Sequence, residues 1–114
     1  MVDDTKVEVS FRFLNLDKFQ ALTLSREVND ATYETHAQKD CFIGRILLKE
    51  QNLDDINHFF IRQKVDIQDC DIFICAQSQS HSNTFNAPRI VNQILKDIDC
   101  KLTFSVTSAE DRKL

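Results

Sequence analysis

Glycine places the strongest limit on this chain, because it occurs only once in 114 residues, at Gly44. Loops that wrap around a phosphate need several glycines, so that the backbone can approach the ligand closely. The sequence therefore excludes P-loop, dinucleotide-binding and kinase-type sites. It also lacks the Gly-x-Ser-x-Gly and His-Glu-x-x-His patterns of two classes of hydrolytic enzyme.

The length and composition predict a single domain that covers residues 1–114. Hydrophobic residues make up 42% of the chain, which is enough to fill a core. No run of about 18 apolar residues is present, so we expect no membrane span. The first residues lack the basic and apolar regions of a signal peptide. We therefore expect a cytoplasmic protein whose four cysteines stay reduced.

The charge of the chain points to a protein partner rather than to a nucleic acid. The formal net charge is −4, and lysines and arginines are scattered singly along most of the sequence. Proteins that bind nucleic acids usually carry a basic stripe or patch, which is missing here. An acidic protein can instead complement a basic protein partner.

Alternating apolar and polar residues predict strands, and apolar residues three or four positions apart predict helices. Five strands are expected, at residues 7–13, 31–37, 41–49, 72–75 and 102–106. Three helices are expected, beginning near Asn15, Asn52 and Pro88. The short apolar strand at 72–75 is typical of a strand that is central or covered on both sides.

This order of elements, β-α-β-β-α-β-α-β, begins with the split β-α-β arrangement of ferredoxin-like folds. We therefore expect an α+β domain with a mixed five-stranded sheet and three helices packed on one face. The last helix and strand extend the ferredoxin-like core. Residues 1–5 and 108–114 are expected to be flexible ends.

The phrase Asn-Leu-Asp occurs twice, at residues 15–17 and 52–54, each time before an expected helix. Asn15 and Asn52 are expected to cap these helices, because Asn accepts hydrogen bonds from the free N–H groups of a first turn. Asp17 and Asp54 would follow in the first turn, where the helix dipole favours negative charge. The repeat predicts helix starts rather than chemistry.

The stretch IVNQILKDIDCKLTFSV at residues 90–106 closes the chain with a helix and an alternating strand. In this order of elements the chain resembles a family of small, mostly bacterial domains of unknown function. The resemblance implies the fold described above and assigns no activity. In size and charge the chain is also similar to bacterial toxin-immunity proteins, by analogy only.

Asp-Cys occurs three times, ending at Cys41, Cys70 and Cys100, each time at the start of an expected strand. If these strands run parallel, three thiolates and a carboxylate or His36 could meet and bind zinc. The usual Cys-x-x-Cys spacing is absent, so buried thiols and no metal or other cofactor are expected.

Catalysis by a cysteine and a histidine is a second reading of the same residue types. Cys75 or Cys100 could act with His58 or His81, but nothing in the spacing selects a pair. No catalytic residue is therefore predicted.

Aspartates gather before the last two strands, at Asp66, Asp69 and Asp71 and at Asp97 and Asp99. Because the starts of parallel strands share one end of a sheet, these five side chains are expected to lie close together. Such a cluster can be a solvated turn, an acid–base or divalent-metal site, or a docking surface for a basic protein. The docking surface is our prediction.

His81, in the polar loop 77–86, is added to the predicted partner-binding residues. The function predicted from the sequence is a non-enzymatic protein-binding domain, most specifically a bacterial immunity protein that masks the basic active site of a toxin. One alternative is a small enzyme or ligand-binding domain with a pocket between sheet and helices. Another is a homo-oligomer, such as a homodimer that pairs through the edge strand 31–37.

Overall fold

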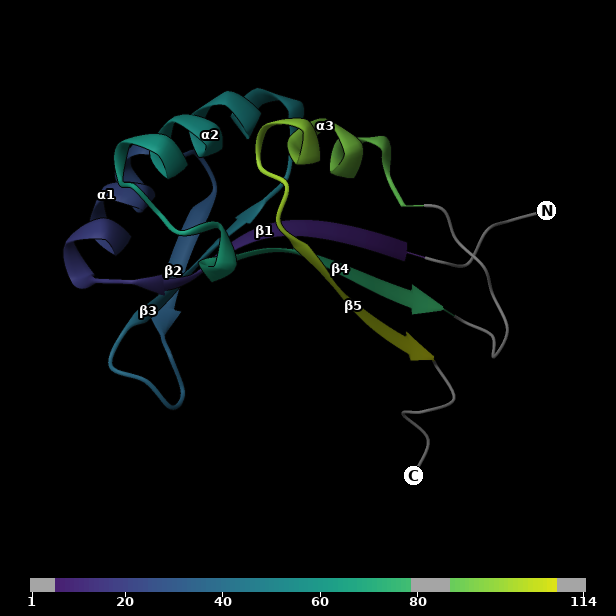
Figure 1. The fold of residues 1–114 in the computed structure, drawn as a ribbon. Helices are drawn as coiled ribbons and strands as arrows, with labels where there is room; N and C mark the ends of the chain where they lie inside the picture. Colours follow the sequence, from purple (N-terminus) through teal and green to yellow (C-terminus); the bar gives the residue numbers. More distant parts are fainter. Residues whose placement is uncertain (1–5, 79–86, 109–114) are drawn as a thin grey trace.

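The computed structural model describes residues 6–78 and 87–108, which form one sheet with three helices on one of its faces (Figure 1). The strands are β1 (Lys6–Leu16), β2 (Ala31–Thr35), β3 (Phe42–Leu47), β4 (Cys70–Ser78) and β5 (Lys101–Ser108). The helices are α1 (Lys18–Glu27), α2 (Leu53–Arg62) and α3 (Arg89–Asp97). Two single 3₁₀ turns, η1 (Glu50–Asn52) and η2 (Ile67–Asp69), precede α2 and β4.

The strand order is β2-β3-β1-β4-β5. Every neighbouring pair is antiparallel except β4 and β5, which are parallel. The connection through α1 passes over β3, and the connection through α2 passes over β1, so both are split β-α-β units. The α3–β5 extension then adds one parallel strand at the edge. The predicted fold class and order of elements are confirmed.

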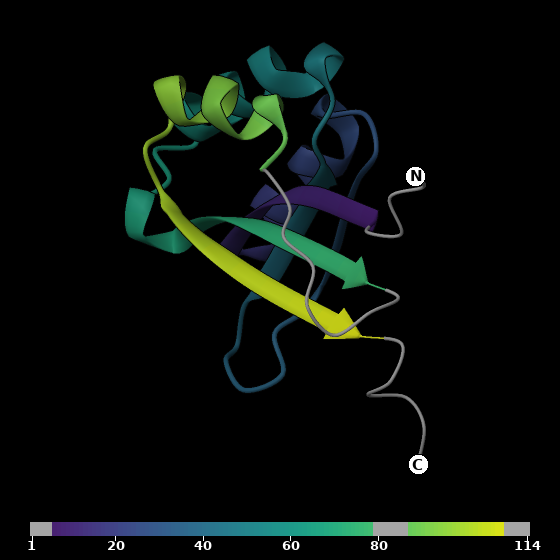
Figure 2. The same cartoon turned by 90° about the vertical axis from the view of Figure 1, so that its right-hand side faces the viewer.

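The core lies between the sheet and the three helices, as Figure 2 shows from the side. Phe11, Phe13 and Ile72 point from the sheet into this layer and are fully buried. Ile56 and Phe59 of α2 meet them from above, and the rings of Phe13 and Phe59 pack edge to face with centroids 5.0 Å apart. The helices bring one apolar face each, which is why the alternating strands have one buried face and one open face.

The helix that follows the first Asn-Leu-Asp phrase is capped by a different residue from the one expected. Asn15 lies inside β1, and Asp17 is the N-cap of α1. The Asp17 side chain accepts a hydrogen bond from the Gln20 backbone N–H at 2.7 Å, and the Gln20 side chain accepts one from the Asp17 N–H. The prediction that Asn15 caps the helix was wrong, because this reciprocal capping box fits Asp and Gln three residues apart.

In the second Asn-Leu-Asp phrase, at residues 52–54, the Asn side chain connects two elements instead of capping a helix. Asn52 precedes α2 but makes no side-chain cap to that helix. It is buried, and its side chain accepts from the Lys49 N–H and donates to the Leu47 carbonyl. Asn52 therefore fastens the end of β3 to the start of α2, and its two hydrogen bonds offset the cost of burying an amide.

Gly44 is required by packing and not by an unusual backbone angle. A Cβ atom at this position of β3 would overlap the Leu24 side chain of α1 and lie 3.1 Å from Leu16. The left-handed backbone positions that often favour glycine are taken instead by Asp30 and Lys64. The single glycine thus lets a helix approach the sheet closely.

Several element boundaries differ from those expected. β4 is longer than the predicted 72–75, and it is interior rather than covered on both sides. Ile72, Ile74 and Ala76 are buried, so the alternating Phe73 and Cys75 lie on the face without helices. The apolar run of β4 is continuous because alternate side chains point toward the helices and toward the face without helices. The flexible ends predicted at 1–5 and 108–114 lie outside the described residues, apart from Ser108, which ends β5. Most of the predicted loop 77–86 also lies outside them.

Candidate functional site

The starts of β4 and β5 lie side by side, because the parallel register pairs Asp71 with Lys101. The turn η2 leads into β4, and the α3–β5 connection leads into β5. The structure therefore brings Asp66 and Asp69 to the same end of the sheet as Asp97 and Asp99. We call these four residues the acidic end.

The carboxylates of the acidic end are open to solvent to different degrees. Asp66, Asp97 and Asp99 are exposed, and Asp69 is half-buried. Asp66 also has a local role, because its side chain accepts the Gln68 N–H at 2.9 Å and so caps η2. In the described part of the chain none of the four forms an ion pair.

An open hollow of about 240 Å³ lies within the acidic end. Ile67, Gln68, Asp99 and Lys101 line it. The Lys101 ammonium group donates to the Gln68 carbonyl at 3.4 Å, which holds it against η2. The hollow thus offers a carboxylate, the half-exposed Ile67 side chain and one lysine to a group that enters it.

Asp71 is separate from the acidic end, although it was predicted to belong to it. Its side chain lies on the open face of the sheet and is 1% exposed. Arg12 donates from Nε to Oδ1 at 2.8 Å and from Nη2 to Oδ2, and Thr103 Oγ1 donates to Oδ2 at 2.7 Å. In this arrangement the Asp71 charge is neutralised inside the protein and is not presented to a partner.

The same arginine shields the apolar part of the open face. The Arg12 guanidinium carbon lies 4.3 Å from the centre of the Phe73 ring, and that of Arg45 lies 5.3 Å from it. Stacking of guanidinium groups on an aromatic ring is favourable and keeps the charged heads in water. The Arg12–Asp71–Thr103 cluster was missed in the sequence, because only the register shows that these positions are neighbours.

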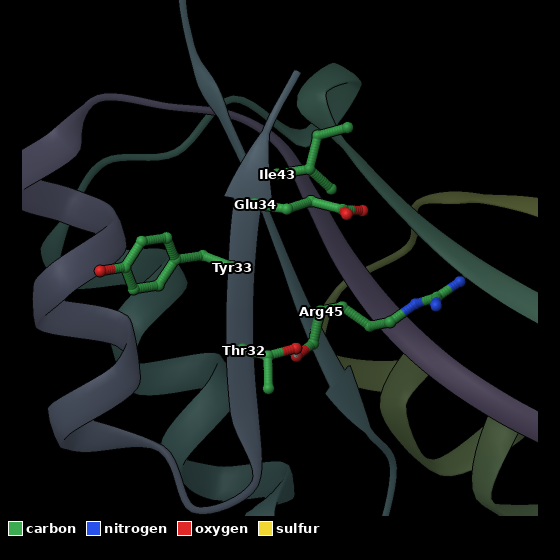
Figure 3. Close-up of a pocket in the computed structure, with 5 residues that line it drawn as sticks. All are labelled: Thr32, Tyr33, Glu34, Ile43 and Arg45. Atoms are coloured by element: carbon green, nitrogen blue, oxygen red, sulfur yellow. Dashed lines mark hydrogen bonds between the residues drawn. The ribbon is translucent and has the colours of Figure 1, made fainter. Parts of the chain in front are cut away.

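Two further hollows do not have the features of a ligand site. The hollow drawn in Figure 3 measures about 140 Å³, and its lining residues are Thr32, Tyr33, Glu34, Ile43 and Arg45. In Figure 3 the Tyr33 ring points away from the Glu34 and Arg45 side chains, so these groups do not converge on one point. Small-molecule sites are usually larger, about 300–1,000 Å³, and have convergent polar groups.

A hollow of about 280 Å³ opens beside the start of α3, between β1 and β3. It is lined by Val7, Glu8, Val9, Leu47, Leu48, Pro88 and Ile90. Among the lining residues that the structure describes, Glu8 is the only ionisable one, so these residues present no acid–base pair to a substrate. Neither of these two hollows therefore favours the enzyme alternative.

The cysteines do not form a metal site in the described part of the chain. Cys41 precedes β3 and Cys70 starts β4, and β1 runs between these two strands. Cys70 and Cys100 are buried together, and burial raises the pKa of Cys70 to about 12 and that of Cys100 to about 11. Among the residues placed by the structure, no three His, Cys, Asp or Glu side chains are arranged to hold a metal ion.

The histidines considered for catalysis are placed apart from these thiols or are not placed. His58 is exposed on α2, whereas Cys100 is buried at the start of β5. A raised pKa keeps the Cys100 thiol protonated near neutral pH, which makes it a poor nucleophile. His81, predicted as a partner contact, lies outside the described residues.

Comparison with known proteins adds no relative. No family model matches the chain, and neither a search of curated proteins nor a search of solved structures finds a similar protein. None of the helices in the described ranges is both long and apolar enough to cross a membrane. Any proposal about function therefore rests on the structure of this chain itself.

Proposed function

We propose that this protein is a non-enzymatic protein-binding domain that docks a basic protein on its acidic end. The observation that carries the proposal is that Asp66 and Asp69, which precede or lie in the turn before β4, share one end of the sheet with Asp97 and Asp99, which precede β5, and that Asp99 lines an open hollow there. Grouped charges of one sign raise the rate at which an oppositely charged partner associates, and they select against partners of the same sign.

The hollow suggests how one side chain of the partner would bind. A lysine or arginine could lay its aliphatic stem on Ile67 and place its charged head beside Asp99. Asp66, Asp69 and Asp97 would surround this contact as a rim. Each exposed rim pair would contribute only about 0–1 kcal/mol, so the rim acts mainly on the association rate.

The more specific form of the proposal is a cytoplasmic bacterial immunity protein that masks the basic active site of a toxin. A toxin that acts on a nucleic acid carries a basic active site, because its substrate is a polyanion. A small acidic domain of net charge −4 can cover such a site and exclude the substrate. The catalytic chemistry then belongs to the partner.

The test begins with the triple variant Asp69→Asn/Asp97→Asn/Asp99→Asn. Asp66 is left unchanged because it caps η2. Wild-type protein is used to capture its partner from the native cell, the captured protein is identified and purified, and association and dissociation rates are measured over a salt series. We expect a basic partner, association slowed about tenfold or more at low salt in the variant, and little difference at high salt.

The matched control is Glu50→Gln/Asp54→Asn/Asp55→Asn, which removes three charges at the start of α2. It should associate almost as fast as wild type, because α2 begins after the end of β3, at the opposite end of the sheet from the acidic end. Equal association rates for the acidic-end variant and the control would contradict the proposal. So would a captured partner that is itself acidic.

A further inference from the structure

Among the residues at 6–78 and 87–108, β5 is an edge strand, and its apolar side is not covered by the helices. Its residues Leu102, Phe104 and Val106 pair with Ile72, Ile74 and Ala76 of β4, so the six side chains lie on the helix-bearing face of the sheet. Those of β4 are at most 1% exposed. By contrast, Leu102 is 40%, Phe104 56% and Val106 61% exposed. The helical layer therefore covers β4 and ends before β5 (Figure 2).

The middle of β5, from Leu102 to Val106, carries none of the features that protect an edge strand against pairing, and the one charged residue of the strand is Lys101, at its first position. Edge strands are usually protected by charge, proline, a bulge or short length. β5 spans eight residues, and positions 102–106 contain no charged residue, no proline and no glycine. The opposite edge strand, β2, has five residues and carries the exposed Glu34.

We propose that β5 pairs antiparallel with β5 of a second copy, which joins two five-stranded sheets into one. A two-fold axis at Phe104 places Phe104 opposite its own copy, Thr103 opposite Ser105, and Leu102 opposite Val106. Each pair matches apolar with apolar or hydroxyl with hydroxyl. A register shifted by one residue would place apolar side chains opposite hydroxyl side chains. A shift by two residues keeps apolar opposite apolar for part of the strand, but only the register centred on Phe104 pairs Leu102, Phe104 and Val106 entirely with one another.

A second copy suits this edge better than a charged partner strand. The strand from Leu102 to Val106 has no ionisable side chain, so self-pairing meets no like-charge repulsion there. Antiparallel pairing also places the two acidic ends, which precede each β5, at opposite ends of the joined strands. The two chains therefore avoid repulsion between their most acidic regions. Because the two-fold axis uses the same strand of both chains, the assembly stops at a dimer.

This inference does not rest on the proposed function, but it has a consequence for it. In the joined sheet both acidic ends stay open, one on each side of the two-fold axis. A dimer could therefore bind two basic partners without contact between them. The residues that test dimerisation are different from those that test partner binding, so failure of one proposal leaves the other intact.

The first test measures mass in solution over a series of concentrations for the full chain. We expect wild type to reach twice the 13.2 kDa of one chain. Phe104→Lys should keep the single-chain mass at every concentration, because it brings two ammonium groups together at the two-fold axis. Its far-UV circular dichroism and its melting curve at high dilution should match wild type, because Phe104 is already largely exposed.

The matched control is Phe19→Lys, the same change at a 72% exposed residue of α1. It should dimerise like wild type. A wild type that remains a single chain at every concentration overturns the proposal, and so does a Phe104→Lys variant that still dimerises. A monomeric wild type whose Phe104→Lys variant loses a captured partner would assign the edge to another protein's strand, which also overturns it.

The second test identifies the register by cross-linking. Phe104→Cys should form an intermolecular disulfide rapidly under mild oxidation, because residues opposite each other at a two-fold axis bring their Cβ atoms close. Leu102→Cys should cross-link much more slowly with itself, because its neighbour in the other copy is Val106. Wild type, with its half-buried Cys41 and Cys75, gives the background. Equal rates for the two variants would refute the centred register.

Discussion

Replacement of Asp71 by Asn tests whether this carboxylate is a structural ion-pair partner rather than a member of the docking surface. The change keeps the shape of the side chain and removes its charge. One acceptor oxygen becomes an NH₂ group that faces a donor, either Arg12 Nε at the Oδ1 position or Arg12 Nη2 and Thr103 Oγ1 at the Oδ2 position. We expect a marked loss of stability from a substitution that would be almost silent at an exposed position.

The magnitude follows from burial and from the number of hydrogen bonds. Removing one partner of a fully buried ion pair costs about 3–5 kcal/mol. Here the Asp71 side chain is 1% exposed, but that of Arg12 is 22% exposed and can be partly hydrated after the change. We therefore expect a loss of about 2–4 kcal/mol in the free energy of unfolding, since water screens part of the lost attraction. For a chain of this size the melting temperature should fall by about 8–16 °C.

Urea denaturation followed by circular dichroism would measure this loss. The control Asp99→Asn removes an equally charged but exposed carboxylate and should change the free energy of unfolding by less than about 0.5 kcal/mol. A double-mutant cycle with Arg12→Gln should give a coupling of about 1 kcal/mol or more, because the two side chains are in direct contact. A loss below about 1 kcal/mol for Asp71→Asn would refute the reasoning.

The pH dependence of stability gives a second measure of the same pair. Burial alone would raise the pKa of Asp71, but hydrogen bonds from Arg12 and Thr103 and the charges of Arg12 and Lys101 lower it below its usual value. In the unfolded chain the pKa returns to about 3.9. The contribution of Asp71 is therefore complete above about pH 4 and is lost as the pH falls through the lower, folded-state pKa. Asp71→Asn should lose less stability than wild type over this acidic range.

Two further predictions concern packing and the thiols. Gly44→Ala should cost about 1–3 kcal/mol in denaturant melts, because the added Cβ overlaps Leu24 and forces α1 away from the sheet; an unchanged midpoint would show that α1 does not approach so closely. In native protein at neutral pH, Cys70 and Cys100 should react with a thiol reagent far more slowly than Cys41 and Cys75, because burial raises the pKa of both thiols and blocks access. Rapid reaction of all four before unfolding would contradict this expectation, and mass spectrometry of labelled peptides would show which thiols react.

The sequence by itself determined the order of elements and the fold class. The alternation around Phe11 and Phe13 and the stripe from Val91 to Ile98 each have one structural period, so local pattern was enough to predict a strand and a helix. The parallel direction of β4 and β5 followed from the connecting helix. That direction was enough to predict that Asp66 and Asp69 share one end of the sheet with Asp97 and Asp99.

Only the tertiary structure decided what each of these side chains contacts. Asp71 looked like its acidic neighbours in the sequence, but the register of β1 against β4 places it opposite Arg12 and removes it from the surface. Likewise the alternation in β5 predicted a strand, but it did not show that the helices end before Phe104 and leave it exposed. A repeating pattern shows which side chains share a face. Burial and pairing depend on neighbours distant in the sequence, and only the folded chain brings these together.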